Sequence, residues 1–306
     1  MLTIGSRGSK LALWQANWVR EALAHIGQEC RIEIIRTTGD KITDVPLAKV
    51  GTKGLFTKEI EEALLDGRID LAVHSLKDLP TELPEGLRIA AIPEREDARD
   101  ALVGRRLADL EAGMKVGTSS LRRVAQLRAA RPGLVIESVR GNLDTRLRKL
   151  AEGQYDALVL AAAGLRRLGW ADRIAEYLPA AVMCPAVGQG ALAIETRAEG
   201  AAAETCARLD HAPTHVAVDA ERAVLARLGG GCQVPIGAHA SLNGDRLELE
   251  AVVALPDGSC VIRRSASGAA AEAAGIGRAL GQELLDAGGR RILEQVYGGP
   301  VRDVVQ

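Results

Sequence analysis

Aromatic residues are the scarcest class in this chain of 306 residues. Phe, Trp and Tyr together make up 2% of it, so a core must be built from Leu, Ile, Val and Ala. Proteins that bind single-stranded nucleic acid stack bases on aromatic side chains, and this composition supplies few such platforms. The formal net charge of -1 provides no overall field that would attract DNA or an anionic membrane. We therefore expect neither a nucleic-acid partner nor a membrane partner.

Long apolar runs and cysteine pairs are also missing. No stretch of about 18 apolar residues occurs, so no transmembrane helix is expected. The first residues, MLTIGSR, contain neither an apolar signal region nor a lipidation motif. The five cysteines are scattered without a C-x-x-C pair, which argues against structural zinc and favours a reducing compartment. These absences predict a cytoplasmic protein without a metal site.

The length of the chain suits two or three domains rather than one core. Strands alternate with helices from residue 2 to residue 161, a pattern typical of parallel α/β units. A charge run at 94–100 predicts a hinge between two such units. A strand at 191–195 could return the chain to the first sheet. From about residue 213, a long helix, three short strands and a final helical stretch predict a small α+β domain.

The predicted fold is therefore α/β, with two periplasmic-binding-protein-like lobes joined by a hinge and a smaller α+β C-terminal domain. We assign residues 1–94 and 191–209 to the first lobe, 95–190 to the second lobe and 210–306 to the third domain.

Two segments, residues 4–10 and 116–123, share one pattern: a strand, a Gly/Ser/Thr turn, and a helix with arginine or lysine at its start. A helix N-terminus presents free N–H groups and a partial positive charge, which suit an anion. Simple N-capping by Ser9 or Ser120 is the alternative for either segment alone. Because the pattern occurs in consecutive units, it favours an arginine-lined cleft for a polyanion between two lobes.

Two further strand exits carry polar residues. Arg140 follows a predicted strand and opens a helix that contains Arg146, and ligands of open α/β sheets bind beyond the carboxyl ends of strands. A solvated basic helix face explains Arg146 equally well. Lys77 and Asp78 likewise follow a strand, where catalytic groups are found, although Asp78 could be only a turn residue.

Cys232 lies in the loop GGGCQVP, residues 229–235. The glycines end the preceding helix and bend the backbone, which favours an exposed thiol; a small buried residue is the alternative. His211 and His215 have a metal-like interval, but Pro213 lies between them and favours the start of a helix there, so they need not share a face. The short GQG at 188–190 is no dinucleotide fingerprint, and no P-loop is present.

Together these segments resemble the porphobilinogen deaminase family, also called hydroxymethylbilane synthases. The matching blocks follow one another in order over almost all of the first 240 residues. They are residues 6–16 (SRGSKLALWQA), 53–59 (KGLFTKE), 74–80 (HSLKDLP), 117–123 (GTSSLRR), 140–142 (RGN), 185–191 (PAVGQGA) and 229–237 (GGGCQVPIG).

The resemblance implies a transferase of tetrapyrrole biosynthesis. Such an enzyme condenses four porphobilinogen molecules head to tail, with loss of ammonia, to form the linear tetrapyrrole hydroxymethylbilane. The resemblance also implies a dipyrromethane cofactor, made from the same substrate and bound as a thioether to the cysteine that matches Cys232. Asp78 matches the catalytic aspartate of the family.

The remaining site residues are assigned by their positions in the matching blocks. Each porphobilinogen carries an acetate and a propionate, so a growing chain accumulates carboxylates, which arginines bind well. The residues expected at the cofactor are Lys77, Thr118, Ser120, Arg122, Arg123, Arg146 and Gln189, of which Arg146 could equally meet the growing chain. Those expected at the substrate are Arg7, Ser9, Lys53, Ser75, Arg140 and Arg167. No residue is assigned to a metal.

Two other classes of protein share some of these features. A solute-binding protein also has two hinged lobes, but it would be expected to carry a secretory signal and would not need Cys232. A ligand-sensing regulator would need a DNA-binding helix pair or a basic patch ahead of the lobes, and the sequence shows neither. We expect a monomeric cytoplasmic enzyme. The sequence leaves open which arginine meets which carboxylate, how elongation stops, and whether the 39–54 loop is mobile.

Overall fold

The computed structural model describes residues 1–41, 55–230 and 234–298. The chain divides into two compact units, unit 1 with Met1–Glu96 and Gly190–His215 and unit 2 with Asp97–Gln189 and Val216–Gln306. The chain therefore passes between the units close to the predicted hinge and again near residues 190 and 215. This division into two units does not test the predicted division into three domains, so the predicted domain boundaries stay a prediction.

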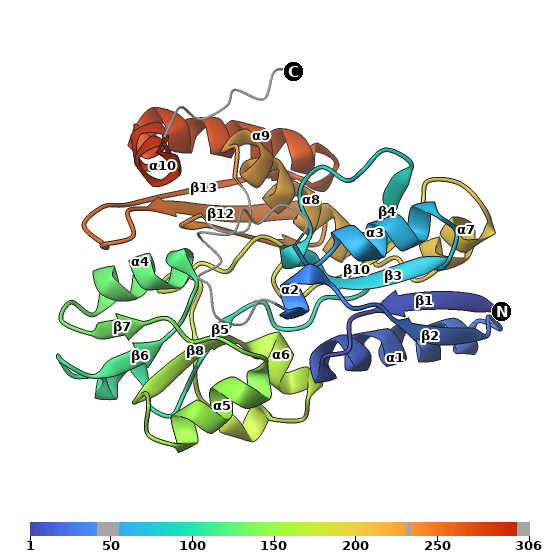
Figure 1. Cartoon of the computed structure of the whole chain (residues 1–306). Helices are drawn as coiled ribbons and strands as arrows, with labels where there is room; N and C mark the ends of the chain where they lie inside the picture. The colour runs from blue at the N-terminus through green and yellow to red at the C-terminus, as the bar shows by residue number, and fades with distance from the viewer. Residues whose placement is uncertain (42–54, 231–233, 299–306) are drawn as a thin grey trace. The chain divides into compact units, whose positions relative to one another are not determined.

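Unit 1 contains a five-stranded sheet in the order β2-β1-β3-β10-β4 (Figure 1). Its strands are β1 (Leu2–Ser6), β2 (Cys30–Ile34), β3 (Leu71–Ser75), β4 (Leu87–Ala91) and β10 (Leu192–Arg197). Strand β1 is parallel to β2 and β3, whereas β10 is antiparallel to both β3 and β4. The predicted return of the chain to this sheet is confirmed.

Helices cover both faces of this sheet. They are α1 (Lys10–His25), α3 (Lys58–Leu65) and α7 (Ala201–Ala207); two shorter turns are α2 (Thr38–Lys41) and the 3-10 turn η2 (Leu76–Asp78). Side chains of α1 pack with Val73 of β3, while those of α3 pack with the neighbouring Ala72. Because neighbouring strand residues point to opposite faces, α1 and α3 lie on opposite sides of the sheet.

Unit 2 contains a second five-stranded sheet, in the order β7-β6-β8-β5-β9. Its strands are β5 (Asp100–Val103), β6 (Lys115–Gly117), β7 (Val135–Glu137), β8 (Ala157–Ala161) and β9 (Ile174–Leu178). Its helical elements are α4 (Leu121–Ala130), α5 (Leu143–Ala151), α6 (Ala162–Arg167), η3 (Leu107–Asp109) and η4 (Ala171–Arg173).

The alternation of strands and helices predicted parallel sheets, and each sheet contains one strand that departs from this direction. Strand β5 runs antiparallel to both β8 and β9, as β10 does to its neighbours in unit 1. The alternation of strands and helices constrains only consecutive βαβ units. Strands β5 and β10 both follow a passage of the chain from one unit to the other, so that constraint does not apply to them.

The rest of unit 2 is an antiparallel sheet covered by helices. Strands β11 (Ile236–Asn243), β12 (Arg246–Ala254) and β13 (Val261–Ala269) lie in this order, with η5 (Ala270–Glu272), α9 (Ala273–Leu284), the π-turn η6 (Leu285–Gly289) and α10 (Arg290–Tyr297) after them. Leu249 of β12 shares a buried cluster with Val224 of α8 (Ala212–Arg227) and Leu284 of α9. Two α/β lobes and a smaller α+β part confirm the predicted fold class.

Two searches of the described residues bear on membrane and metal binding. No helix in this part of the chain is both long and apolar enough to cross a bilayer. Among the same residues, no group of three His, Cys, Asp or Glu lies where it could hold a metal ion. The two closely spaced histidines have separate partners: His211 Nδ1 lies 2.8 Å from Thr214 Oγ1, and His215 Nδ1 lies 2.8 Å from Asp210 Oδ1.

Candidate functional site

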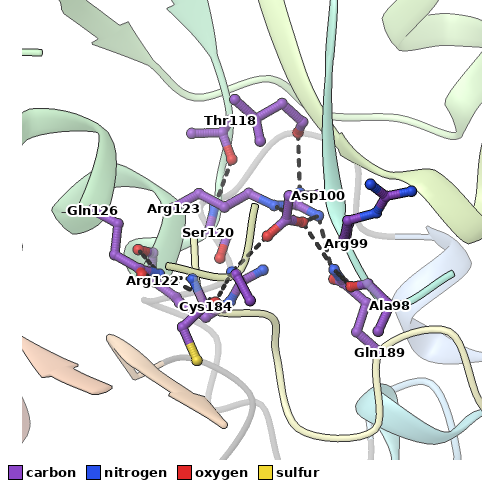
Figure 2. A network of polar contacts seen from close by, with 12 residues as sticks. Ala98, Arg99, Asp100, Thr118, Ser120, Arg122, Arg123, Gln126, Cys184 and Gln189 are labelled. Atoms are coloured by element: carbon purple, nitrogen blue, oxygen red, sulfur yellow. Dashed lines mark hydrogen bonds and ion pairs between the residues drawn. The ribbon is translucent and has the colours of Figure 1, made fainter. Parts of the chain in front are cut away.

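Asp100 is the carboxylate on which several predicted site residues converge. It begins β5 and is fully buried, and the side chains of Arg122, Arg123 and Gln189 point toward it (Figure 2). Its Oδ1 accepts hydrogen bonds from Arg123 Nε at 2.9 Å and Nη2 at 2.7 Å, and from Gln189 Nε2 at 3.0 Å. Its Oδ2 accepts one from Arg122 Nη1 at 2.6 Å. These four bonds use the accepting capacity of a carboxylate.

Both arginines lie in the first turn of α4, directly after the turn that follows β6. Arg122 is 3% exposed and Arg123 is 7% exposed, which is unusual for arginine and requires partners for the buried charge. Arg122 Nη1 also donates to the Cys184 carbonyl at 2.5 Å, and Arg123 Nη1 donates to the Val159 carbonyl at 3.1 Å. These contacts fix the direction of both guanidinium groups inside unit 2.

Two glutamines complete the framework around the arginines. Gln189 Nε2 donates to the Ala98 carbonyl at 2.7 Å as well as to Asp100, so it holds the start of β5 at two points. Gln126 Oε1 accepts a hydrogen bond from the Cys184 amide at 2.8 Å, and its Nε2 donates to the Cys184 carbonyl at 3.2 Å. In this structure Gln189 supports Asp100, and its contact with a cofactor stays a prediction.

The framework holds two cations and one anion. Burial by itself raises the pKa of Asp100, but the positive charges of Arg122 and Arg123 outweigh it and hold that pKa well below its usual range. Asp100 is therefore ionised at neutral pH and neutralises one arginine of the pair. One positive charge remains among these three residues, which suits an incoming carboxylate.

Thr118 and Ser120 line the turn before α4. Thr118 is 2% exposed, its amide donates to the Glu137 carbonyl at 2.9 Å, and its Oγ1 accepts from the Ser120 amide at 3.3 Å. Ser120 stands at the N-cap of α4, yet its hydroxyl makes no capping hydrogen bond. Simple capping therefore does not explain Ser120. Ser9, by contrast, caps α1 by accepting from the Ala12 amide at 3.3 Å.

Lys77 and Asp78 lie in unit 1 on the 3-10 turn that follows β3. Leu76 and Leu79, on either side of them, are 1% and 3% exposed and anchor the turn in the core. The Leu76 amide donates to the Ala191 carbonyl at 3.0 Å, which joins the turn to the start of β10. Asp78 is exposed and Lys77 is half-buried, so this short turn presents the Asp78 carboxylate to the surroundings of unit 1.

The other described residues assigned to substrate in unit 1 lie at strand ends. Arg7 follows β1 and forms an ion pair with Asp40. Ser75 ends β3, and its hydroxyl accepts a hydrogen bond from Gln15 Nε2 at 2.9 Å. Ser9, at the start of α1, contributes the cap described above.

Three predicted arginines of unit 2 lie away from the described contacts of Asp100. Arg140 is half-buried after β7, and Lys149 Nζ lies 3.5 Å from its carbonyl oxygen. Arg146 is half-buried on α5, and its Nε donates to the Gly141 carbonyl at 2.8 Å. Arg167 ends α6 and is half-buried. The structure brings Thr118, Ser120, Arg122, Arg123 and Gln189 into one neighbourhood but does not add these three to it.

Cys232 and Lys53 lie outside the described residues, as does most of the predicted 39–54 loop. The attachment of a cofactor to Cys232 and the contact of Lys53 with substrate therefore stay predictions.

Asp100 is the residue that sequence reasoning missed. It ends the charge run at 94–100, which the sequence analysis interprets as a hinge. Its last residue, Asp100, is instead the first residue of β5, whose four residues are all buried. The available signal was the apolar triplet Ala101, Leu102 and Val103 directly after the aspartate, since a carboxylate next to such a run needs a buried cation.

Comparison with known families decides where the chain belongs. The family model described as "Porphobilinogen deaminase, dipyromethane cofactor binding domain" matches residues 2–205, and "Porphobilinogen deaminase, C-terminal domain" matches residues 215–286. The chain belongs to the porphobilinogen deaminase family. The resemblance seen in the sequence is thereby confirmed.

Individual porphobilinogen deaminases are similar over almost their whole length. That of Syntrophobacter fumaroxidans is 55% identical over 303 residues, covering 97% of this chain and 98% of the relative. That of Geobacter sulfurreducens is 53% identical, covering 97% and 95%. Among solved structures, a periplasmic substrate-binding protein of an ABC transporter from Coxiella burnetii is 13% identical with a TM-score of 0.45, covering 72% of this chain and 97% of that one.

The residues around Asp100 fit the cofactor named for this porphobilinogen deaminase domain. The side-chain hydrogen bonds of Arg122 to described residues all come from Nη1, and its Nε and Nη2 donate to none of these residues. Neither atom is among the enclosed side-chain atoms without a partner in the described part of the chain, so this edge of the guanidinium can be reached, and a carboxylate matches it with two bonds. A dipyrromethane carries such carboxylates. The donor set of Arg122, Thr118 and Ser120 is therefore suited to it.

Proposed function

We propose that this chain condenses four porphobilinogen molecules head to tail, with release of ammonia, to form hydroxymethylbilane. It acts as a transferase of tetrapyrrole biosynthesis with a dipyrromethane primer. The observation that carries the proposal is the buried arginine pair at Asp100, which retains one positive charge inside the domain named for the dipyrromethane cofactor. A substrate and a product that carry many carboxylates require such positive charge away from water.

Arg122, Arg123, Thr118 and Ser120 hold the cofactor carboxylates in this proposal, and Lys77, Arg146 and Gln189 assist them. When bound, the dipyrromethane supplies the pyrrole to which each new unit is joined. Asp100 keeps both arginines in place before the cofactor arrives, so little reorganisation of buried charge accompanies its binding.

Cys232 is the attachment point in this proposal, and the other cysteines support that choice. Cys184 and Cys206 are buried, and burial raises the pKa of both thiols, that of Cys206 to about 12. A thiol must ionise to act as a nucleophile, so neither buried residue suits the role. Cys30 is half-buried, and burial also raises the pKa of its thiol. Cys260 is exposed, but it lies directly before β13 and outside the matching blocks of the family.

Asp78 carries the chemistry at the reacting carbon. Ammonia leaves the aminomethyl carbon of porphobilinogen with the bonding electron pair, and a cationic methylene-pyrrole remains. A carboxylate near the pyrrole N–H stabilises this charge as it develops, by several kcal/mol, roughly, in a site from which water is excluded. After the carbon–carbon bond forms, the α-carbon of the older ring loses its proton, and Asp78 guides that proton away.

Arg7, Ser9, Lys53, Ser75, Arg140 and Arg167 bind the incoming ring or the growing chain. The protein is a cytoplasmic monomer and has no nucleic-acid or membrane partner in this proposal. Its net charge of -1 supports the absence of such partners.

The test is a two-product assay with the purified chain and porphobilinogen. We expect porphobilinogen to disappear with release of one ammonia for each molecule consumed and with formation of a linear tetrapyrrole. Porphobilinogen that is bound but returned unchanged would instead indicate a solute-binding protein.

A further inference from the structure

The guanidinium of Arg7 has a partner within unit 1. Arg7 follows β1, and Asp40 lies on α2. Arg7 Nε donates to Asp40 Oδ1 at 3.1 Å, and Arg7 Nη2 donates to the same oxygen. The two side chains are 25% and 30% exposed, so the pair is partly shielded from water. A single carboxylate oxygen therefore takes the whole edge of the guanidinium that is formed by Nε and Nη2.

The carboxylate of Asp40 is itself held in place. Its Oδ2 accepts hydrogen bonds from the Thr37 amide at 3.2 Å and from the Thr37 hydroxyl at 2.8 Å. Partial burial alone raises the pKa of Asp40, but the bonds from Arg7 and Thr37 outweigh this effect and lower it. Asp40 is therefore ionised wherever the enzyme would be assayed near neutral pH. Its charge and its direction are both fixed by neighbours on the chain.

An aromatic ring covers one face of the guanidinium and leaves its edges open. The Phe56 ring centroid lies 4.3 Å from Arg7 Cζ, a distance at which a cation is attracted to the face of a ring. This ring also explains the glycine before Asp40. A Cβ added to Gly39 would lie 2.2 Å from a Phe56 ring atom, and the Gly39 amide donates to the Leu55 carbonyl at 2.8 Å. Gly39 thus lets Phe56 reach the guanidinium of Arg7.

A guanidinium has two edges that can each accept a carboxylate with two parallel bonds. Asp40 takes the edge formed by Nε and Nη2. Arg7 Nη1 makes no hydrogen bond to any described residue, so the edge formed by Nη1 and Nη2 stays available. We propose that Asp40 is a positioning residue that orients this edge of Arg7 toward a carboxylate of porphobilinogen, an inference that rests on the substrate role proposed for Arg7.

The same contact has an opposite interpretation, which the test separates. If Asp40 occupied the edge that the substrate uses, substrate would have to displace it, and removal of its charge would tighten substrate binding. If Asp40 orients Arg7, its removal lets the arginine side chain take several rotamers and weakens binding. Because the substrate carboxylates lie away from the reacting carbon, they are held equally in the ground state and the transition state, so the change falls on KM.

The experiment compares steady-state kinetics of holoenzyme variants with porphobilinogen as substrate. We expect Asp40→Asn to raise KM roughly five- to tenfold with little change in kcat, and Asp40→Glu to recover part of the loss. Two matched variants serve as controls. Glu59→Gln removes a neighbouring charge that bonds Thr38 rather than Arg7, and Asp97→Asn breaks an ion pair of the same kind, since Arg99 binds Asp97 and stacks over Tyr177. Both controls should leave KM unchanged.

The outcomes distinguish this inference from the proposed function. An unchanged or lowered KM in Asp40→Asn, with a raised KM in Arg7→Lys, would overturn the positioning role and leave the substrate role of Arg7 intact. An unchanged KM in both variants would overturn both roles of this pair. A loss of kcat in Asp40→Asn without a change in KM would also overturn the inference. The wild-type assay separately tests whether porphobilinogen is condensed at all.

Discussion

Replacement of Asp100 by Asn tests the framework that holds the arginine pair. The change keeps the volume of the side chain but removes the charge that balances Arg122 and Arg123. Asp100 is fully buried and the two arginines are 3% and 7% exposed, so solvent screens these charges little. Removal of one partner from a buried ion pair costs about 3–5 kcal/mol, because the remaining charge stays uncompensated. We expect the free energy of unfolding to fall by that amount.

The same variant should lose cofactor as well as stability. Without the Asp100 charge, Arg122 and Arg123 keep only their bonds to neutral acceptors such as the Cys184 and Val159 carbonyls, and the two like charges repel each other. The assay combines chemical denaturation with intact-mass measurement of the fraction of purified chains that carry a covalent two-pyrrole adduct. We expect Asp100→Asn to contain less adduct than the wild type even when expressed at low temperature.

A milder variant and a control keep this prediction open to refutation. Gln189→Leu leaves the buried charges in place but removes the hydrogen bonds of Gln189 to Asp100 and to the Ala98 carbonyl; it should cost about 2 kcal/mol with a smaller loss of adduct. Asp97→Asn removes a charge three residues before Asp100, from an ion pair whose Arg99 side chain is 48% exposed, and should cost about 1 kcal/mol. If Asp100→Asn unfolds like Asp97→Asn and carries a full complement of adduct, the reasoning about the buried charges is wrong.

Two other substitutions test groups in unit 1. Asp78→Asn should keep the covalent adduct but lose turnover, and near-normal turnover in a steady-state assay would remove Asp78 from its role. Glu61 is buried on α3, and burial together with the nearby Glu195 carboxylate raises its pKa by more than Thr57 and His74 lower it. The carboxyl group of Glu61 therefore ionises less readily in the folded chain than in the unfolded chain, where its pKa has the usual value of 4.5. As pH rises above 4.5 and through the higher pKa of the folded state, Glu61 makes the folded state progressively less stable. Glu61→Gln should match the wild type in acid and be the more stable protein near pH 8 in denaturation experiments; parallel pH profiles would contradict this.

Much of the fold could be predicted from local patterns in the sequence. The apolar runs at β3 and β8 are bounded by turn signals, and the three strands expected after the long helix near residue 213 are present as β11, β12 and β13. The antiparallel direction of β5 and β10 could not be predicted, because it depends on the passage of the chain between units rather than on local spacing.

Site residues that lie in a strand–turn–helix pattern could be predicted from the sequence. Arg122 and Arg123 follow such a turn, but their buried partner Asp100 lies 22 and 23 residues earlier, and Gln189 lies 89 residues after Asp100. The hydrophobic pattern of a sequence indicates local helices and strands, but it does not indicate which residues so far apart in the sequence contact each other. Asp40 was missed for a similar reason, since its ion pair with Arg7 spans 33 residues.

The most direct test of the account is the intact mass of the chain before and after it receives porphobilinogen. We predict that the purified wild-type chain is heavier than its sequence by two pyrrole units, that Cys232→Ser lacks this increment, and that brief exposure to porphobilinogen adds further single-pyrrole steps to the wild type only. An active wild-type enzyme with an unmodified Cys232, or a Cys232→Ser variant that still carries the adduct, would contradict the proposal that the tetrapyrrole grows on a primer bound at this residue.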